Sequence, residues 1–147
     1  MELAIWLVMV VTVLGLGMGS MLWAYRRPLG TEPLFRAAMT STSLPLSHRA
    51  QEQFEKGCGA FQQGRYTAAI AAFNRTLQRE PGCAEAWHNS GRCQANLGQD
   101  GLAVEAFLQA SDRYNQQGTR VGLDAVKQDL VALAQRHPQS GAEPTGG

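Results

Sequence analysis

Hydrophobic and polar positions divide the chain into a long apolar run at its start and a periodic region behind it. Between Leu3 and Ala24 the chain carries no charged side chain, and the polar groups of the run are those of Thr12 and Ser20. A helix of this length measures about 33 Å, which exceeds the hydrocarbon core of a bilayer, about 30 Å thick. Arg26 and Arg27 follow directly, so we expect residues 1–27 to form a transmembrane anchor with a basic flank.

We expect this anchor to stay uncleaved. Met1 and Glu2, which precede the apolar run, carry no basic group, and the run is longer than the core of a signal peptide, about 7–15 residues. A cleaved signal peptide is the alternative. Because basic residues favour the cytoplasmic side, Arg26, Arg27 and Arg36 predict that the rest of the chain lies in the cytoplasm or in the equivalent organellar space, such as the stroma.

Two glycines of the apolar run suggest a helix-pairing face. Gly15 and Gly19 form a GxxxG motif, which allows two membrane helices to approach closely and predicts a homodimer. The alternative interpretation is that glycine is simply frequent in membrane helices.

Residues 28–46 and 138–147 contain turn-forming residues without periodicity. The first segment includes Pro28, Pro33 and Pro45 and a run of Thr and Ser at 40–43, which predicts a linker rather than a packed element. A short helix over 34–38, lying along the membrane surface, is the alternative. The last ten residues are expected to be disordered.

Residues 47–137 contain a repeat with a period of 34 residues. This offset places Gly57 on Gly91, Gly64 on Gly98, Ala69 on Ala103 and Phe73 on Phe107. Apolar residues between these points recur with a helical period, Gly64 and Gly98 suit the left-handed end of a helix, and Asp100 suits an N-cap. The pattern predicts an all-α fold with helices over 47–63, 66–79, 84–97, 100–115 and 119–136, in which two helix pairs are followed by a capping helix.

These residues resemble the tetratricopeptide repeat (TPR) family. Gly64 to Phe73, with Leu77 and Pro81, resembles the second half of one repeat. A complete second repeat is suggested by Ala84, Trp87, Gly91, Leu97, Gly98, Ala103, Phe107 and Ala110. The resemblance covers about residues 50–117. Close packing predicts that Ala69 and Ala103 lie where paired helices cross and that Phe73 and Phe107 fill the layer between the pairs. The resemblance implies that the first helix of each pair lines a groove.

Charge and chemistry exclude several classes of function. Thirteen basic residues face twelve acidic ones, so a strongly basic nucleic-acid-binding protein is excluded. The three Cys and three His are spaced without a metal-ligand pattern, and no catalytic constellation or phosphate-binding loop is present. We therefore expect neither an enzyme nor a cofactor, and we interpret the cysteines as buried apolar residues.

The family register places candidate binding residues on the first helices of the two pairs. The mixture of aromatic, amide and Arg side chains suits an extended or helical peptide held by hydrogen bonds and an aromatic anchor. The alternative is that the aromatic residues are partly core and the polar ones a solvated face. The candidates are Phe54, Glu55, Phe61, Gln62, His88, Asn89, Arg92 and Asn96.

Together these features predict a single-pass membrane adaptor that binds protein partners during the assembly of a membrane complex. The layout of an N-terminal anchor, a linker and a few repeats resembles that of the cyanobacterial and plastid TPR proteins that assist photosystem I assembly, which implies a thylakoid location. The alternative is an accessory subunit of a bacterial envelope machine for secretion, division or cytochrome maturation, in the plasma membrane.

Overall fold

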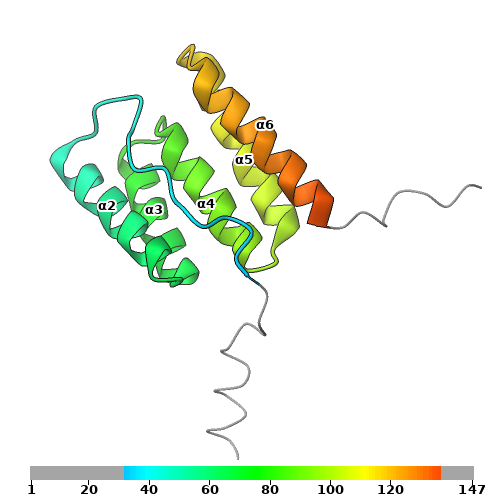
Figure 1. Cartoon of the computed structure of the whole chain (residues 1–147). Helices are drawn as coiled ribbons and strands as arrows, with labels where there is room; N and C mark the ends of the chain where they lie inside the picture. Colours follow the sequence, from blue (N-terminus) through cyan, green and yellow to red (C-terminus); the bar gives the residue numbers. More distant parts are fainter. Residues whose placement is uncertain (1–31, 137–147) are drawn as a thin grey trace, which may run out of the picture. The chain divides into compact units, whose positions relative to one another are not determined.

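The computed structural model describes residues 32–136, and this part of the chain is all-α (Figure 1). Its helices match the predicted ranges to within one residue at each end. They are α2 (His48–Gln62), α3 (Tyr66–Arg79), α4 (Ala84–Asn96), α5 (Asp100–Gln116) and α6 (Arg120–Arg136). The predicted anchor, its Gly15 and Gly19 face and the tail at 138–147 lie outside the described residues. Within residues 32–136 no helix is long and apolar enough to cross a membrane.

The five helices pack as two hairpins, α2–α3 and α4–α5, followed by α6 against α5. The hairpin turns depend on Gly64 and Gly98, whose φ angles of +69° and +74° lie in the left-handed region that glycine tolerates best. Asp100 does not cap α5 as expected, because the helix already begins at this residue. Its carboxylate instead pairs with Arg136 of α6 at 3.1 Å.

In each hairpin, a glycine of the first helix packs against an aromatic ring of the second helix. A Cβ atom on Gly57 would lie 2.5 Å from the ring of Phe73, and one on Gly91 would lie 2.7 Å from the ring of Phe107. Both rings are fully buried. The two phenylalanines therefore lie inside their own hairpins, and the expectation that they lie between the hairpins is wrong.

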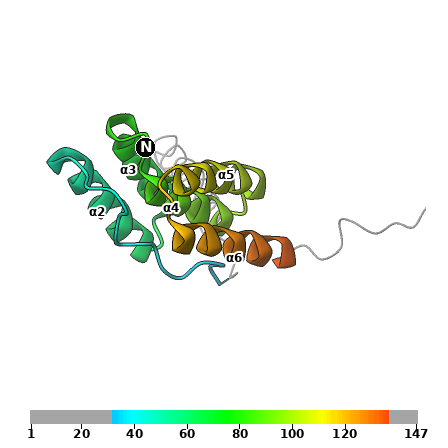
Figure 2. The same cartoon turned by 90° about the horizontal axis from the view of Figure 1, so that it is seen from above.

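The greatest departure from expectation concerns residues 33–46. This segment is not a loose linker, and no helix forms over 34–38. It runs along α4 in a non-helical conformation (cyan in Figure 1), and Figure 2 shows it passing between α2 and α6. The turn-forming composition correctly predicts the absence of helix, but it does not reveal that distant polar side chains hold the segment.

Candidate functional site: a groove with an extended segment in it

One face of α4 carries four polar side chains, and we call this face the groove. Glu85, Asn89, Arg92 and Asn96 are separated by four, three and four positions, which places them on a single side of the helix. Each of these side chains bonds to the segment over residues 33–46. The direction of that segment is antiparallel to α4, because Phe35 meets Asn96 near the end of the helix and Ser43 meets Glu85 near its start.

Two asparagines bind the backbone of the segment in the same way. The side-chain oxygen of Asn96 accepts the N–H of Phe35 at 2.9 Å, and its amide nitrogen donates to the carbonyl of Phe35 at 2.8 Å. Asn89 repeats this pair of bonds with Met39 at 2.8 and 2.9 Å. Each carboxamide thus satisfies both backbone groups of one residue, as a neighbouring β-strand would.

Arg92 and Glu85 add contacts between and beyond the two asparagines. Arg92 donates from Nη1 to the carbonyl of Ala37 at 3.1 Å. Glu85, which is almost fully buried, accepts the backbone N–H of Ser43 at 2.9 Å and its hydroxyl at 2.5 Å on the same oxygen. The groove therefore recognises backbone along most of its length and a hydroxyl side chain at one end.

Phe35 is the apolar anchor of the segment. Its ring is 8% exposed and packs edge-on against Phe107 of α5, with ring centres 6.0 Å apart. The guanidinium of Arg92 lies 5.5 Å from the ring centre, within range of a cation–π interaction. Four residues further on, the sulfur of Met39 accepts the hydroxyl of Tyr114 at 3.4 Å. The segment thus inserts side chains as well as backbone.

A buried ion cluster supports α4 from the side of α6. Asp129 accepts Nε of Arg92 at 2.5 Å and Nη2 at 3.2 Å, and it lies 2.7 Å from Nε2 of His88. Burial lowers the pKa of His88 and outweighs the opposing effect of Asp129. Burial opposes ionisation of Asp129, but the hydrogen bonds from His88 and Arg92 outweigh it and lower the pKa of the carboxyl. We infer a neutral His88 that donates to an ionised Asp129.

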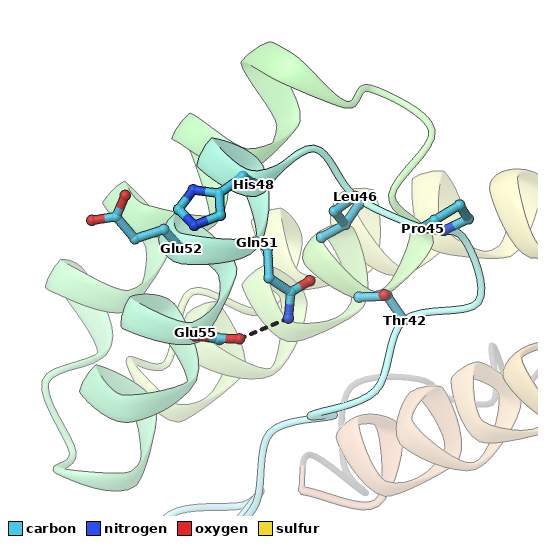
Figure 3. A pocket seen from close by; sticks show the side chains of 7 residues that line it. All are labelled: Thr42, Pro45, Leu46, His48, Gln51, Glu52 and Glu55. Atoms are coloured by element: carbon cyan, nitrogen blue, oxygen red, sulfur yellow. Dashed lines mark hydrogen bonds between the residues drawn. The ribbon is translucent and has the colours of Figure 1, made fainter.

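Two hollows adjoin the second half of the segment, residues 39–46. On the α2 side a hollow of about 680 Å³ opens between residues 42–46 and the first turns of α2 (Figure 3). Its wall includes Glu52 and Glu55, and Glu55 accepts a hydrogen bond from Gln51 at 2.8 Å. A second hollow of about 200 Å³, on the α6 side, is lined by Met39, Glu85, Tyr114 and Val121 among others.

The structure distributes the sequence candidates over three environments. Asn89, Arg92 and Asn96 lie together in the groove, and His88 lies beneath them in the ion cluster. Phe54 and Phe61 are core residues of the first hairpin, with rings against Phe73 and Tyr66, so neither is an open aromatic anchor. Glu55 and Gln62 are exposed on α2, and Glu55 lines the larger hollow.

Sequence reasoning missed Glu85, Asp129 and the segment itself. Glu85 precedes Asn89 by four positions, so extending the polar face of the predicted helix by one turn would have found it. No sequence pattern links Asp129 to Arg92 or Phe35 to Asn96, because these pairs are separated by 37 and 61 residues.

The cysteines offer no reactive site in this fold. All three are buried, and burial raises the pKa of the thiol to about 11 at Cys58 and about 12 at Cys83 and Cys93. Thiols held protonated in this way are poor nucleophiles and poor metal ligands. From residue 32 to residue 136, no group of three or more His, Cys, Asp or Glu side chains is arranged to hold a metal ion.

The helix pairs and their glycine-on-aromatic contacts agree with a family comparison, in which the model described as "Tetratricopeptide repeat" matches residues 54–118. Residues 54–118 are a TPR region. Neither the curated proteins nor the solved structures contain a match to the chain. TPRs are typical of non-catalytic scaffolds that bind proteins, so this region indicates a protein–protein interaction function. The comparisons provide no named relative for the resemblance to photosystem I assembly proteins.

Proposed function

We propose that the protein is a TPR adaptor whose groove binds an extended peptide of a protein partner. The observation that supports this function most directly is the paired hydrogen bonding of Asn89 and Asn96 to the backbone of residues 39 and 35. A groove that satisfies peptide N–H and C=O groups with side-chain amides accepts an extended chain without requiring a particular side chain at every position. The aromatic contact at Phe35 and the Glu85 contact at Ser43 add selectivity.

We further propose that residues 3–24 anchor this adaptor in a membrane and that it serves the assembly of a membrane complex. The uncharged run and the basic residues behind it support the anchor. A tether raises the local concentration of the groove near membrane partners, so a modest affinity is sufficient for recruitment. Photosystem I assembly in a thylakoid is the narrower form of this proposal.

The test is capture of partners from detergent-solubilised membranes by the full chain, with identification by mass spectrometry. Because the chain's own segment lies in the groove, the bait carries Phe35→Ala and Met39→Ala. Adding Asn89→Ala and Asn96→Ala to this bait should weaken capture about tenfold or more, at roughly 1 kcal/mol or more for each lost pair of bonds.

The matched control replaces two exposed asparagines of the outer helices, Asn74 and Asn115, by alanine in the same bait. Capture should then be unchanged. If the outer pair weakens capture as much as the groove pair, or if the groove pair has no effect, the groove is not the partner site. Recovery of photosystem I subunits would support the narrower form, and recovery of secretion or division subunits would contradict it.

A further inference from the structure

Residues 33–43 occupy the groove in the manner of a bound peptide. Phe35, Met39 and Ser43, whose backbone N–H groups are all accepted by side chains of α4, follow one another at intervals of four residues. The carbonyl of Ala37, between the first two, accepts a hydrogen bond from Arg92. The polar contacts that the face of α4 makes with this segment go to its backbone or to the Ser43 hydroxyl. A structural strap would need only to cover the helices, whereas this segment engages each of the four polar side chains on the face of α4.

Another peptide or water can also replace the segment as the hydrogen-bonding partner of α4. Apart from Phe35, no residue from 33 to 46 is fully buried, and Thr40, Ser41 and Ser43 are exposed. The asparagine, arginine and glutamate side chains that hold the segment can bond to water or to another peptide when it leaves. The hollows beside residues 39–46 leave room for a second chain to approach this end of the segment. The apolar contacts of the segment with the core are those of the buried Phe35 and of the partly buried Leu34, Ala38 and Leu46. Elements with fewer buried apolar contacts than their surroundings open before the rest of a fold.

We propose that residues 33–43 are an intramolecular peptide ligand that closes the groove, and that the partner displaces it with an extended peptide of the same register. This inference rests on the proposed function, because the groove must accept a peptide from another protein. The partner peptide presents an aromatic residue in the place of Phe35, an unbranched thioether or aliphatic residue four positions on, and Ser or Thr after four more.

The geometry sets further requirements on that peptide. The residues in the places of Phe35, Met39 and Ser43 each donate a backbone N–H, so none of them is proline. The segment is joined to α2 by only a few residues, so it competes at a high effective concentration. The apparent affinity for the partner is therefore lowered by the small fraction of time for which the groove is open.

The test uses the full chain in detergent and a labelled synthetic peptide with the sequence of residues 32–46. The peptide should bind the Phe35→Ala chain about tenfold or more tightly than the wild-type chain, because the weakened segment leaves the groove open. The matched control, Thr40→Ala, changes an exposed residue of the segment and should bind as the wild type does. A peptide in which its own Phe is replaced by Ala should bind neither chain.

Hydrogen exchange on the wild-type chain gives a second measurement, which does not depend on the folding of a variant. The amides of residues 35 and 39 should exchange faster than those of α4, and added peptide should accelerate them further. Equal peptide binding by the wild-type and Phe35→Ala chains, or exchange at these amides only on global unfolding, would show that the segment is a fixed part of the fold and would overturn the proposal. If the protection of these amides against exchange decreases when the protein is diluted, the proposal is also overturned, because the segment in the groove would then come from a second copy of the chain.

The two proposals fail in different experiments. Loss of groove dependence in the partner capture contradicts the adaptor function. Slow, global exchange of the segment, with groove-dependent capture retained by the bait that carries Phe35→Ala and Met39→Ala, contradicts only the intramolecular ligand.

Discussion

Replacing Gly91 with alanine should destabilise the protein, although alanine is the better helix former. Gly91 lies inside α4, where a Cβ atom would be 2.7 Å from two ring atoms of Phe107 and 3.2 Å from the backbone oxygen of Ala103. Carbon atoms in contact normally lie about 3.5–4.0 Å apart, so the ring would have to move by roughly 1 Å. That movement is resisted, because the buried ring is packed against His88 and Phe35.

The magnitude follows from two opposing effects. Overpacking a core position costs about 1–3 kcal/mol. The gain in helix propensity from Gly to Ala is about 1 kcal/mol. Because three atoms would lie closer than normal contact to the new Cβ, we expect an overpacking cost in the upper part of that range, about 2–3 kcal/mol. The net loss for Gly91→Ala is then about 1–2 kcal/mol, which corresponds to a fall in Tm of about 4 °C or more in a domain of this size.

Gly59 in α2 is the matched control, because a Cβ atom added there would meet nothing within 4 Å. Gly59→Ala should keep the propensity gain and raise Tm. Thermal unfolding of the full chain, followed by circular dichroism, measures both substitutions under one set of conditions. The glycine-on-aromatic account is refuted if Gly91→Ala leaves Tm unchanged or raises it, or if the two substitutions shift Tm in the same direction.

Three further measurements test the core, the ion cluster and the buried thiols. Ala103→Leu, at a fully buried helix crossing, should lower the free energy of unfolding in urea by about 1–3 kcal/mol. Ala71→Leu, on the exposed side of α3, should change this free energy little, and equal effects would show that the helix register is wrong. The lowered pKa values of His88 and Asp129 mean that their contribution to stability is complete above about pH 6.5. This contribution should fall as acid protonates first the imidazole and then, below about pH 4, the carboxylate. Tm should therefore decline below about pH 6.5, and a Tm that does not decline there would show that His88 is charged in the fold. Iodoacetamide at pH 8 should label Cys58, Cys83 and Cys93 far more slowly in the folded chain than in denaturant, because burial raises each thiol pKa to about 11 or 12. Equal labelling rates in the two states would contradict the burial of these thiols.

The sequence is sufficient to predict the helices because their signals are local. A period of 34 residues, apolar residues at helical spacing and glycines at the turns each act over a few neighbours, and they agree with one another. The repeat also identifies which residues are equivalent. The repeat does not show against which neighbour an equivalent residue packs. For this reason it places Phe73 and Phe107 between the hairpins, although each ring packs inside its own hairpin.

The candidate site is only half predictable because its two sides have different origins. Asn89, Arg92 and Asn96 share a helical face, so helical periodicity alone brings them together. The chain that they bind comes from a segment with no periodicity and several turn-forming residues. Its conformation is fixed by hydrogen bonds to residues 50 and 61 positions away, and local sequence rules contain no information about such distant partners.

Arg92 shows why groove residues cannot be assigned to binding or to folding alone. Two of its three bonding nitrogens are bound to Asp129 of α6, and the third donates to the carbonyl of Ala37 in the segment. Removing its side chain would leave a buried carboxylate with His88 as its remaining partner, and breaking a buried ion pair in this way is strongly destabilising. Asn96 and Asn89, by contrast, direct their carboxamides to the bound segment. Neither asparagine takes part in the ion cluster, although Asn89 is fully buried and its amide nitrogen also lies 4.0 Å from the sulfur of Cys58. Substituting the asparagines therefore tests recognition more directly than substituting Arg92, which joins the groove to the helix that caps the repeats.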